Sequence, residues 1–487
     1  IAPHDIDVVA YSYDPSLAPP ASDDFAALDY EGLRTFYVRR LPHFLASLFP
    51  GIESAEVTYV PHHLAHAASA YLCAPYDSCA VMTLDGRGES TSFLAGHVRN
   101  GRFDALGSVA LPHSLGLRYE ELTMHLGFMR SSDEYKVMGM AGYGSPRFAE
   151  RLREAMFATG IGYNAPPLDL TQFCAARTAM DESFSQDHAD LAASVQQRLQ
   201  EILLEIATEL HAQTGERRLT MAGGVALNCV ANSYVYERSP FDDVWVQPAA
   251  GDAGTSLGAA LYVARERGDA TQPMTTAALG RGWDDDALRA SLDLAAVPYR
   301  RAHDIAESVA DILAGDGLVA WFQGRSEFGP RALGHRSLLA HPGHAANLRR
   351  LNDVKGREQF RPVAPMVLAE RAAEIFEGGP LPSPYMLFTH RVRDAWRERL
   401  AAITHVDGTA RVQTVDEREE PLVAAMLRAF ERRTGLPVVV NTSLNTAGRP
   451  MVDEPRDALE CFGSTPVDAL AIGPFLLSRR THASVAA

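Results

Sequence analysis

Strand-like apolar runs punctuated by glycine recur along this chain, and their alternation with helix-like segments limits its fold more than any other feature. The runs are DVVAYSY, CAVMTLDG, RLTMAGGVA and DVWVQPAAGDAG. Residues 188–214 keep apolar side chains at helical spacing and stop before Gly215, which predicts a helix. Alternating strands and helices favour an α/β fold with partly parallel sheets.

The length and one irregular stretch predict the domain organisation. A chain of 487 residues fits two or three domains at roughly 150 residues each. The sequence turns polar and irregular around residues 264–286, as linkers do, and α/β patterning restarts with a helix over 304–315. We therefore expect an N-terminal domain at 1–270, a linker at 271–286 and a C-terminal domain at 287–487.

Charge and hydropathy exclude several classes of partner. Lys plus Arg is 45 and Asp plus Glu is 61, which gives a net charge of −16 and disfavours binding to nucleic acid or anionic lipid. No apolar run approaches the ~20 residues of a membrane-spanning helix. The five cysteines lack CxxC spacing, which suits a reducing cytoplasm. The chain starts at Ile1 without Met or a signal sequence, so we expect part of the natural N-terminus to be missing.

A histidine-rich segment, PHHLAHAASA at residues 61–70, offers a metal site. In a helix His62 and His66 share one face, where two imidazole nitrogens can bind the same ion, and His63 points elsewhere. The strand and turn TLDGRGE follow, and they bring the carboxylate of Asp85 toward the same place. The alternative is a set of surface or helix-capping histidines.

Two glycine-containing loops extend this hypothesis to a nucleotide. In MAGGVALN a strand ends at Gly223 and Gly224 before a helix, and in QPAAGDAGTSLG the carboxylate of Asp252 directly precedes another helix. Such turns let backbone N–H groups approach phosphate oxygens. Together with the histidine pair, they favour a divalent metal that holds nucleotide phosphates. The alternative is a pair of tight turns in an α/β core.

Cations are concentrated in the C-terminal half. The segments GRSEFGPRALGHRS and KGREQFRPVAP are rich in Arg and Gly, THVDGTARVQ adds an arginine on a strand-like run, and NTSLN ends an apolar strand in hydrogen-bonding side chains. Guanidinium groups bind phosphate oxygens in pairs, so this concentration in an acidic chain indicates an anionic substrate. Surface salt bridges are the alternative.

Eight of these segments occur in an order that resembles a known family. They are HHLAHAASAY, LDGRGE, DEYKVMG, GGVALN, GRSEFGPRALGHRS, KGREQFRPVAP, THVDGTARVQ and NTSLN, and they span nearly the whole chain. The combination resembles the O-carbamoyltransferases of antibiotic and nodulation-factor biosynthesis, of the tobramycin, ansamycin and aminocoumarin carbamoyltransferase type.

The resemblance implies two modules and two reactions. The N-terminal module is similar to the actin-like (ASKHA) ATP-binding fold of the tRNA threonylcarbamoyl transferase, and the C-terminal module resembles threonylcarbamoyl-adenylate synthase. The C-terminal module is expected to form carbamoyl adenylate from carbamoyl phosphate and ATP with magnesium. The N-terminal module then transfers the carbamoyl group to a hydroxyl of a secondary metabolite and releases AMP. A homodimer is a further family expectation.

The resemblance also implies roles for individual residues. The metal ligands correspond to His62, His66, Asp85 and Asp252; iron is expected, with manganese and zinc as the other candidates. The nucleotide-binding residues correspond to Gly223, Gly224, Asn228, Lys136, Ser443 and Asn445. The residues expected to act on carbamoyl phosphate and pyrophosphate are Lys355, Arg357, Arg331, Arg325 and Arg411.

Two departures and three alternatives accompany the resemblance. Nothing in residues 1–50 matches the Gly-His-Asp-Ser-Ala-like loop with which family members open, so the acceptor base is expected outside the numbered residues. The DEYK version of one motif favours an ansamycin or aminocoumarin acceptor. The alternatives are a tRNA threonylcarbamoyl transferase, a hydrogenase-maturation carbamoyltransferase and a non-enzymatic actin-like nucleotide-binding regulator. The acidic charge, the five scattered cysteines and the arginine-rich half argue against them in that order.

Overall fold

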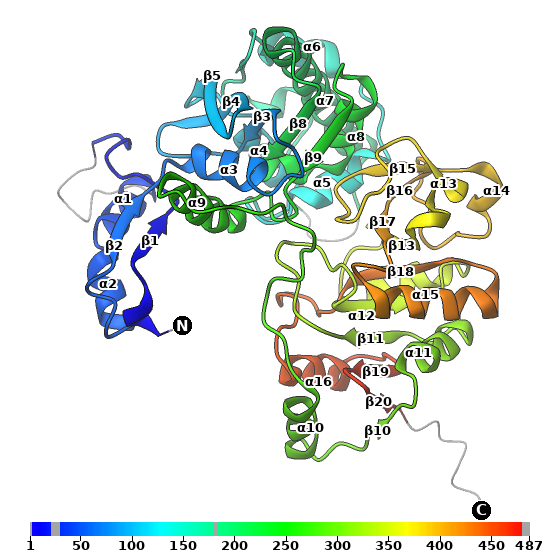
Figure 1. Cartoon of the computed structure of the whole chain (residues 1–487). Coiled ribbons are helices and arrows are strands. Elements are labelled where there is room, and N and C mark those ends of the chain that lie inside the picture. The colour runs from blue at the N-terminus through cyan, green and yellow to red at the C-terminus, as the bar shows by residue number, and fades with distance from the viewer. Residues whose placement is uncertain (1, 21–29, 179–182, 480–487) are drawn as a thin grey trace, which may run out of the picture. The chain divides into compact units, whose positions relative to one another are not determined.

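The computed structural model describes residues 2–20, 30–178 and 183–479, and its contacts divide the chain into two units. The first comprises the described residues of Ile1–Ala179 and Ser185–Met274, and the second those of Met180–Phe184 and Thr275–Ala487. Both units mix helices and strands, so the α/β prediction is confirmed (Figure 1).

The first unit contains helices and strands with the following bounds: β1 (Val8–Tyr11), α1 (Tyr30–Arg39), α2 (Leu41–Leu48), β2 (Glu56–Tyr59), α3 (His62–Tyr71), β3 (Cys79–Leu84), β4 (Thr91–Arg99), β5 (Arg102–Ala110), α4 (Leu115–His125), α5 (Glu134–Ala141), α6 (Ala149–Ala155), β6 (Phe157–Ala158), β7 (Tyr163–Asn164), α7 (Gln186–Thr214), β8 (Arg218–Ala222), α8 (Cys229–Arg238), β9 (Asp243–Val246) and α9 (Ala253–Glu266).

A five-stranded sheet organises the first unit, in the order β5-β4-β3-β8-β9. The strands β3, β8 and β9 are parallel, and β4 and β5 are antiparallel, as the partly parallel pattern predicted. The predicted helix is α7, which begins two residues earlier than expected and ends at Gly215 with φ +65°. The strands β1 and β2 form a separate parallel pair.

Close packing of α3 against α9 shapes the region that holds the histidine motif. A Cβ at Gly258 of α9 would lie 1.9 Å from the carbonyl oxygen of Ala65 on α3, so only glycine permits this approach. Val60, Ala259 and Val263 pack beside Ala65 in the same small cluster. This packing brings the start of α9 next to the histidine face of α3.

The second unit contains helices and strands with the following bounds: α10 (Asp285–Leu294), β10 (Arg300–Arg301), α11 (Ile305–Ala314), β11 (Val319–Phe322), β12 (Arg336–Ala340), α12 (Ala346–Val354), β13 (Ala364–Leu368), α13 (Ala372–Ile375), β14 (Phe376–Glu377), β15 (Thr389–Val392), α14 (Asp394–Arg397), β16 (Thr409–Arg411), β17 (Gln413–Val415), α15 (Pro421–Thr434), β18 (Val438–Ser443), α16 (Pro455–Ser464), β19 (Ala469–Ile472) and β20 (Phe475–Ser478).

An eight-stranded mixed sheet forms the centre of the second unit, in the order β10-β20-β19-β11-β12-β18-β13-β17. The pairs β11/β19 and β13/β17 are parallel, and the other pairs are antiparallel. A small sheet of β14, β15 and β16 accompanies it. The largest buried apolar cluster lies between these strands and α11, α15 and α16.

Most of the stretch expected to be a linker, 271–286, packs on the second unit. Arg281 forms ion pairs of 2.7 Å with Asp453 and with Glu454, and the indole N–H of Trp283 donates to the carbonyl of Asp453 at 3.3 Å. The helix α10 begins at Asp285. The sequence did not predict this packing, because the contacts are made by polar side chains and by partners that are far apart in the sequence.

Two simpler features follow from the described residues. None of the helices there combines the length and the apolar character that crossing a membrane requires. All five cysteines are free thiols, and all are buried except Cys174, which is half-buried.

Candidate functional site

The histidine motif forms the first turns of α3, and two histidines share a face as the spacing predicted. The rings of His62 and His66 lie 4.6 Å apart, centroid to centroid, and both side chains are almost fully buried. His63 is turned toward a different neighbour, since its Nδ1 lies 3.1 Å from the hydroxyl of Thr91. The helix therefore presents two imidazole Nε2 atoms to one point.

Two carboxylates from different loops converge on that point. Asp85 follows β3, and its Oδ2 lies 3.2 Å from Nε2 of His62 and 4.0 Å from Nε2 of His66. Asp252 precedes α9, and its Oδ1 lies 3.5 and 3.6 Å from the same two nitrogens. One donor atom from each of the four side chains lies within 4.8 Å of all the others. The structure thus brings together all four residues predicted to be metal ligands.

The donor set fits a divalent ion. An ion with ligand distances of about 2.1 Å separates neighbouring ligand atoms by roughly 3.0 to 3.4 Å, close to the shorter distances observed. Nδ1 of His62 lies 3.2 Å from the carbonyl of Ser12, and because a carbonyl only accepts, Nδ1 carries a proton. Nε2 is therefore the nitrogen that could bind an ion in place of a proton. Among the described residues, neither ring nitrogen of the buried His66 has a hydrogen-bond partner, and an ion would supply one.

The charges of this cluster are strongly coupled. Burial raises the pKa of Asp85, but the hydrogen bond from His62 and the nearby imidazoles outweigh burial and hold it well below its usual value. Burial lowers the pKa of His62, yet Asp85 and Asp252 raise it above the ordinary value overall. For His63, burial and the neighbouring imidazole lower the pKa to about 3, so His63 is neutral.

The predicted nucleotide-binding residues of the first unit lie in two kinds of environment. The backbone N–H of Gly224 donates to Oδ1 of Asp85 at 2.9 Å, so this loop adjoins the four-donor cluster. Gly223 has φ +94°, and a Cβ there would lie 2.0 Å from the carbonyl oxygen of Leu84. Asn228 instead caps α8, because its Oδ1 accepts from the N–H of Ala231 at 3.0 Å.

The chain contains two lysines, Lys136 and Lys355, and both are residues that the motifs predicted for nucleotide or phosphate. Lys136 lies in the first turn of α5, where it forms an ion pair of 3.0 Å with Asp133. Lys355 follows α12 in the second unit and is buried. The other 43 residues counted as Lys or Arg are arginines, so lysine is rare in this chain.

Lys355 joins the two motifs that were predicted to act together in the second unit. Its Nζ donates to the carbonyl of Ser443 at 2.5 Å, to the hydroxyl of Ser443 at 2.9 Å and to Oδ1 of Asn445. Arg357, two residues further, donates through Nε to Asn352 at 2.5 Å. Burial, and then the charges of Arg357 and Arg361, hold the pKa of Lys355 well below its usual value. A bound anion would favour its charged form.

A loop rich in Gly and Arg connects β11 and β12 beside this cluster. The buried Oε1 of Glu327 accepts from the backbone N–H groups of Leu333 at 2.7 Å, His335 at 2.9 Å and Arg336 at 3.2 Å. The N–H of Leu444, directly after Ser443, donates to the carbonyl of Arg336 at 2.9 Å. The loop therefore ends next to the residues that hold Lys355.

The arginines predicted for this site differ in their positions. Arg331 lies in the loop, and Asn441 and Gln413 anchor its neighbours by donating to the carbonyls of Ala332 at 3.1 Å and Leu333 at 2.7 Å. Arg411 ends β16. Arg325 is exposed, and its guanidinium donates to the carbonyls of Leu279 and Gly280, both at 2.8 Å.

Arg325 therefore fastens residues 279–280 to the rest of the second unit, a contact that its motif did not reveal.

Sequence reasoning also missed three residues that organise the sites. They are Glu89 and Ser12 around His62, and Glu327 inside the arginine-rich loop. The two glutamates lie inside the quoted motifs, but their buried hydrogen bonds depend on tertiary packing.

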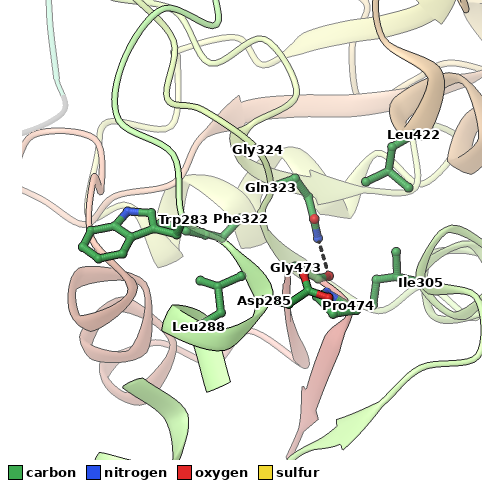
Figure 2. Close-up of a pocket in the computed structure, with 10 residues that line it drawn as sticks. All are labelled: Trp283, Asp285, Leu288, Ile305, Phe322, Gln323, Gly324, Leu422, Gly473 and Pro474. Atoms are coloured by element: carbon green, nitrogen blue, oxygen red, sulfur yellow. Dashed lines mark hydrogen bonds between the residues drawn. The ribbon is translucent and has the colours of Figure 1, made fainter. Parts of the chain in front are cut away.

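A cavity of about 280 Å³ in the second unit lies apart from the predicted residues (Figure 2). Its polar side chains are already paired, since Gln323 donates to the carbonyl of Gly473 at 3.0 Å and Asp285 accepts from Arg301 at 2.9 Å. It therefore defines no ligand chemistry. Its lining residues are Trp283, Asp285, Leu288, Ile305, Phe322, Gln323, Gly324, Leu422, Gly473 and Pro474.

Comparisons with known proteins agree with the family resemblance. Residues 35–261 match the family model described as Carbamoyltransferase N-terminus, and residues 310–479 match Carbamoyltransferase C-terminus. Nodulation protein NolO of Bradyrhizobium diazoefficiens is 41% identical over 438 residues, which cover 86% of this chain and 79% of that protein. Nodulation protein NolNO of Sinorhizobium fredii is 38% identical over 449 residues, covering 88% of this chain and 65% of that protein.

An uncharacterized protein of Synechocystis sp. is also 38% identical, over 86% of this chain and 75% of its own length. The crystal structure of T. kodakarensis HypF is 19% identical and covers 46% of this chain and 38% of its own, at a TM-score of 0.27, which is too low to define the fold.

The two family models, which match residues 35–261 and 310–479, define this protein as a transferase. The chain belongs to the carbamoyltransferase family. The resemblance predicted from the motifs is thereby confirmed, and so is the prediction that the protein is an enzyme.

Proposed function

We propose that this enzyme is an ATP-dependent O-carbamoyltransferase in which each unit carries out one half of the reaction. The observation that carries the proposal is the burial of Lys355 between Ser443 and Asn445, next to the loop that bears Arg331. A buried cation with polar neighbours, and with the guanidinium groups of Arg357 and Arg361 close enough to act on it, suits the polyphosphate of ATP. The four-donor cluster of the first unit has the opposite charge and suits a cation instead.

In the proposed first step, the second unit makes carbamoyl adenylate. Water first cleaves carbamoyl phosphate to carbamate and phosphate. A carboxyl oxygen of the carbamate then bonds to the α-phosphorus of ATP as the bond to pyrophosphate breaks, which gives carbamoyl adenylate and pyrophosphate. Lys355, Arg357, Arg331 and Arg411 would neutralise the phosphate charge that develops, the largest contribution in such transfers. Ser443 and Asn445 would keep the Lys355 ammonium in place. Arg325 is proposed to belong to the same group of cations, and its guanidinium also donates to the carbonyls of Leu279 and Gly280.

In the proposed second step, the first unit transfers the carbamoyl group. The acceptor hydroxyl attacks the carbamoyl carbon, the bond to the AMP oxygen breaks, and a base takes the hydroxyl proton. We propose that His62, His66, Asp85 and Asp252 hold a divalent ion, for which iron, manganese and zinc are all compatible with the donor set. Such an ion supplies Lewis-acid stabilisation of phosphate and carbonyl oxygens. The loop of Gly223 and Gly224, which adjoins Asp85, would lie against the nucleotide there, together with Asn228 and Lys136.

The finer architecture belongs to the same proposal. We propose an actin-like fold for the first unit and a threonylcarbamoyl-adenylate synthase-like fold for the second, as the motif resemblance implies. The acceptor would be a secondary metabolite such as an ansamycin antibiotic, although relatives named nodulation proteins make a nodulation-related acceptor the competing choice. Cytoplasmic location, absence of nucleic-acid and membrane partners, and a homodimer complete the proposal.

The proposal is tested by measuring phosphate and pyrophosphate release with magnesium, ATP and carbamoyl phosphate but no acceptor. We expect pyrophosphate release that requires carbamoyl phosphate. Pyrophosphate release without carbamoyl phosphate, or no release although ATP binds, would contradict the first step. Carbamoylation of hydroxyl compounds then tests the second step, with AMP as the product to detect.

A further inference from the structure

Glu89 is a buried carboxylate beside the four-donor cluster, and none of the motif assignments gives it a role. It lies between β3 and β4 and is 6% exposed. One oxygen, Oε1, accepts the backbone N–H of His62 at 2.9 Å and that of Asp14 at 2.8 Å. A single carboxylate oxygen therefore joins the start of α3 to the loop that follows β1.

The first of these bonds fixes the position of a predicted ligand. His62 is the first residue of α3, and Pro61 before it supplies no side-chain cap. The first N–H groups of a helix lack partners within the helix, and a carboxylate is the acceptor that the helix dipole favours there. Because Glu89 follows Asp85 on the same turn, its bond sets the distance between the helix that carries His62 and the turn that carries Asp85.

The loop after β1 also connects Glu89 to the helix start that carries Asp252. The carbonyl of Ser12 accepts from Nδ1 of His62 at 3.2 Å, and the hydroxyl of Ser12 lies 2.6 Å from that of Thr255 on α9. Thr255 in turn donates to the carbonyl of Asp252 at 2.8 Å. Through Asp14, Glu89 anchors this loop, which contacts both the imidazole of His62 and the start of α9.

We infer that Glu89 is a positioning residue for the metal centre, which it orients through the N–H groups of His62 and Asp14. The inference rests on the proposed metal site. Because a single oxygen makes both bonds, the length of the side chain decides whether both are formed, and the charge adds only the smaller attraction of the helix dipole. Loss of a group that orients metal ligands typically weakens metal binding by about 10- to 100-fold.

Two variants separate reach from charge. Glu89→Gln keeps an acceptor oxygen at the same distance from the backbone but removes the charge, and Glu89→Asp keeps the charge but retracts the carboxylate by one methylene. Glu216→Asp is the matched control, since Glu216 is a buried carboxylate of the same unit that instead pairs with Arg99 at 2.6 Å. The whole chain is used throughout, stripped of metal.

Co²⁺ is the probe, with the dissociation constant from calorimetry, the visible d–d spectrum as a report of ligand geometry, and circular dichroism as the fold control. We expect Glu89→Asp to bind Co²⁺ about 10- to 100-fold more weakly with an altered spectrum. We expect Glu89→Gln to lose clearly less affinity than Glu89→Asp and to keep the wild-type spectrum, and Glu216→Asp to match the wild type in both.

Each other outcome has a definite meaning. Wild-type affinity and spectrum in Glu89→Asp, or a larger loss in Glu89→Gln than in Glu89→Asp, would overturn the assignment while the metal centre stands. Absence of Co²⁺ binding by the wild-type protein would instead refute the metal centre and, with it, this role of Glu89.

Discussion

Replacement of Lys355 by methionine is expected to lower activity strongly and to change stability little. Methionine has a similar length but no charge. If the Lys355 ammonium neutralises charge as pyrophosphate leaves, its loss should lower the rate of carbamoyl phosphate-dependent pyrophosphate release by roughly 10²- to 10³-fold, or about 2.7–4 kcal/mol. The assay is the acceptor-free release assay at saturating ATP and carbamoyl phosphate.

The expected effect on stability is small, because two terms oppose each other. The ammonium donates to the carbonyl and hydroxyl of Ser443 and to Oδ1 of Asn445. After substitution the Ser443 hydroxyl still donates to Asn445 at 2.8 Å, so the Ser443 carbonyl is the acceptor that loses its lysine partner, at a cost of about 1–3 kcal/mol. Removing a buried charge recovers desolvation free energy of similar size.

A matched control shows whether loss of any cation has the same effect. Arg432→Met removes a charge from α15 of the same unit, where Arg432 is 60% exposed and pairs with Glu307. We expect it to keep wild-type rates, and both variants to keep the wild-type melting temperature. Pyrophosphate release at the wild-type rate by folded Lys355→Met would refute the reasoning.

Three further predictions concern stability. Burial raises the pKa of Glu201, but hydrogen bonds from neighbouring arginines and a glutamine lower it to about 2. The contribution of Glu201 to folding stability is therefore present above pH 4.5 and is lost as pH falls toward 2. The difference in melting temperature between wild type and Glu201→Gln should shrink over that range. Burial lowers the pKa of His335, but Glu420 raises it above 6.5 overall. The stability that wild type gains over Glu420→Gln should therefore be complete below pH 6.5 and disappear as pH rises through the folded-state pKa. A difference in melting temperature that stays constant with pH would contradict the pairing. Gly258→Ala places a Cβ 1.9 Å from a backbone oxygen of α3 and should cost about 1–3 kcal/mol and weaken Co²⁺ binding, whereas Gly463→Ala, which meets nothing within 4 Å, should leave thermal stability and Co²⁺ affinity intact.

The four-donor cluster could be predicted from the sequence because local patterns carry most of it. The HxxxH spacing fixes two nitrogens on one helix face, and Asp85 follows a strand, β3, that pairs in parallel with β8. The carboxyl ends of parallel strands share one edge of a sheet, which places the turns after β3 and β8 together. Asp252 required more, since it reaches the cluster through the packing of α9 on α3.

Other features depended on contacts that no local pattern encodes. Arg325 and Arg331 lie in the same motif, yet the Arg325 guanidinium donates to the backbone carbonyls of residues 279–280, which belong to the same unit. Glu89 gains its role from two backbone N–H groups that are 27 and 75 residues away in sequence. In each case, the partner is a backbone atom, which has no sequence signature.

The formation of carbamoyl adenylate is the central claim, and its direct detection is the most decisive measurement. The protein is incubated with magnesium, ATP and [¹³C]carbamoyl phosphate without acceptor, quenched rapidly, and analysed by mass spectrometry. We predict a ¹³C-labelled adduct of AMP and the carbamoyl group that appears with pyrophosphate and is lost in Lys355→Met. ATP binding without any labelled nucleotide, or labelled adduct formed equally by Lys355→Met, would contradict the account.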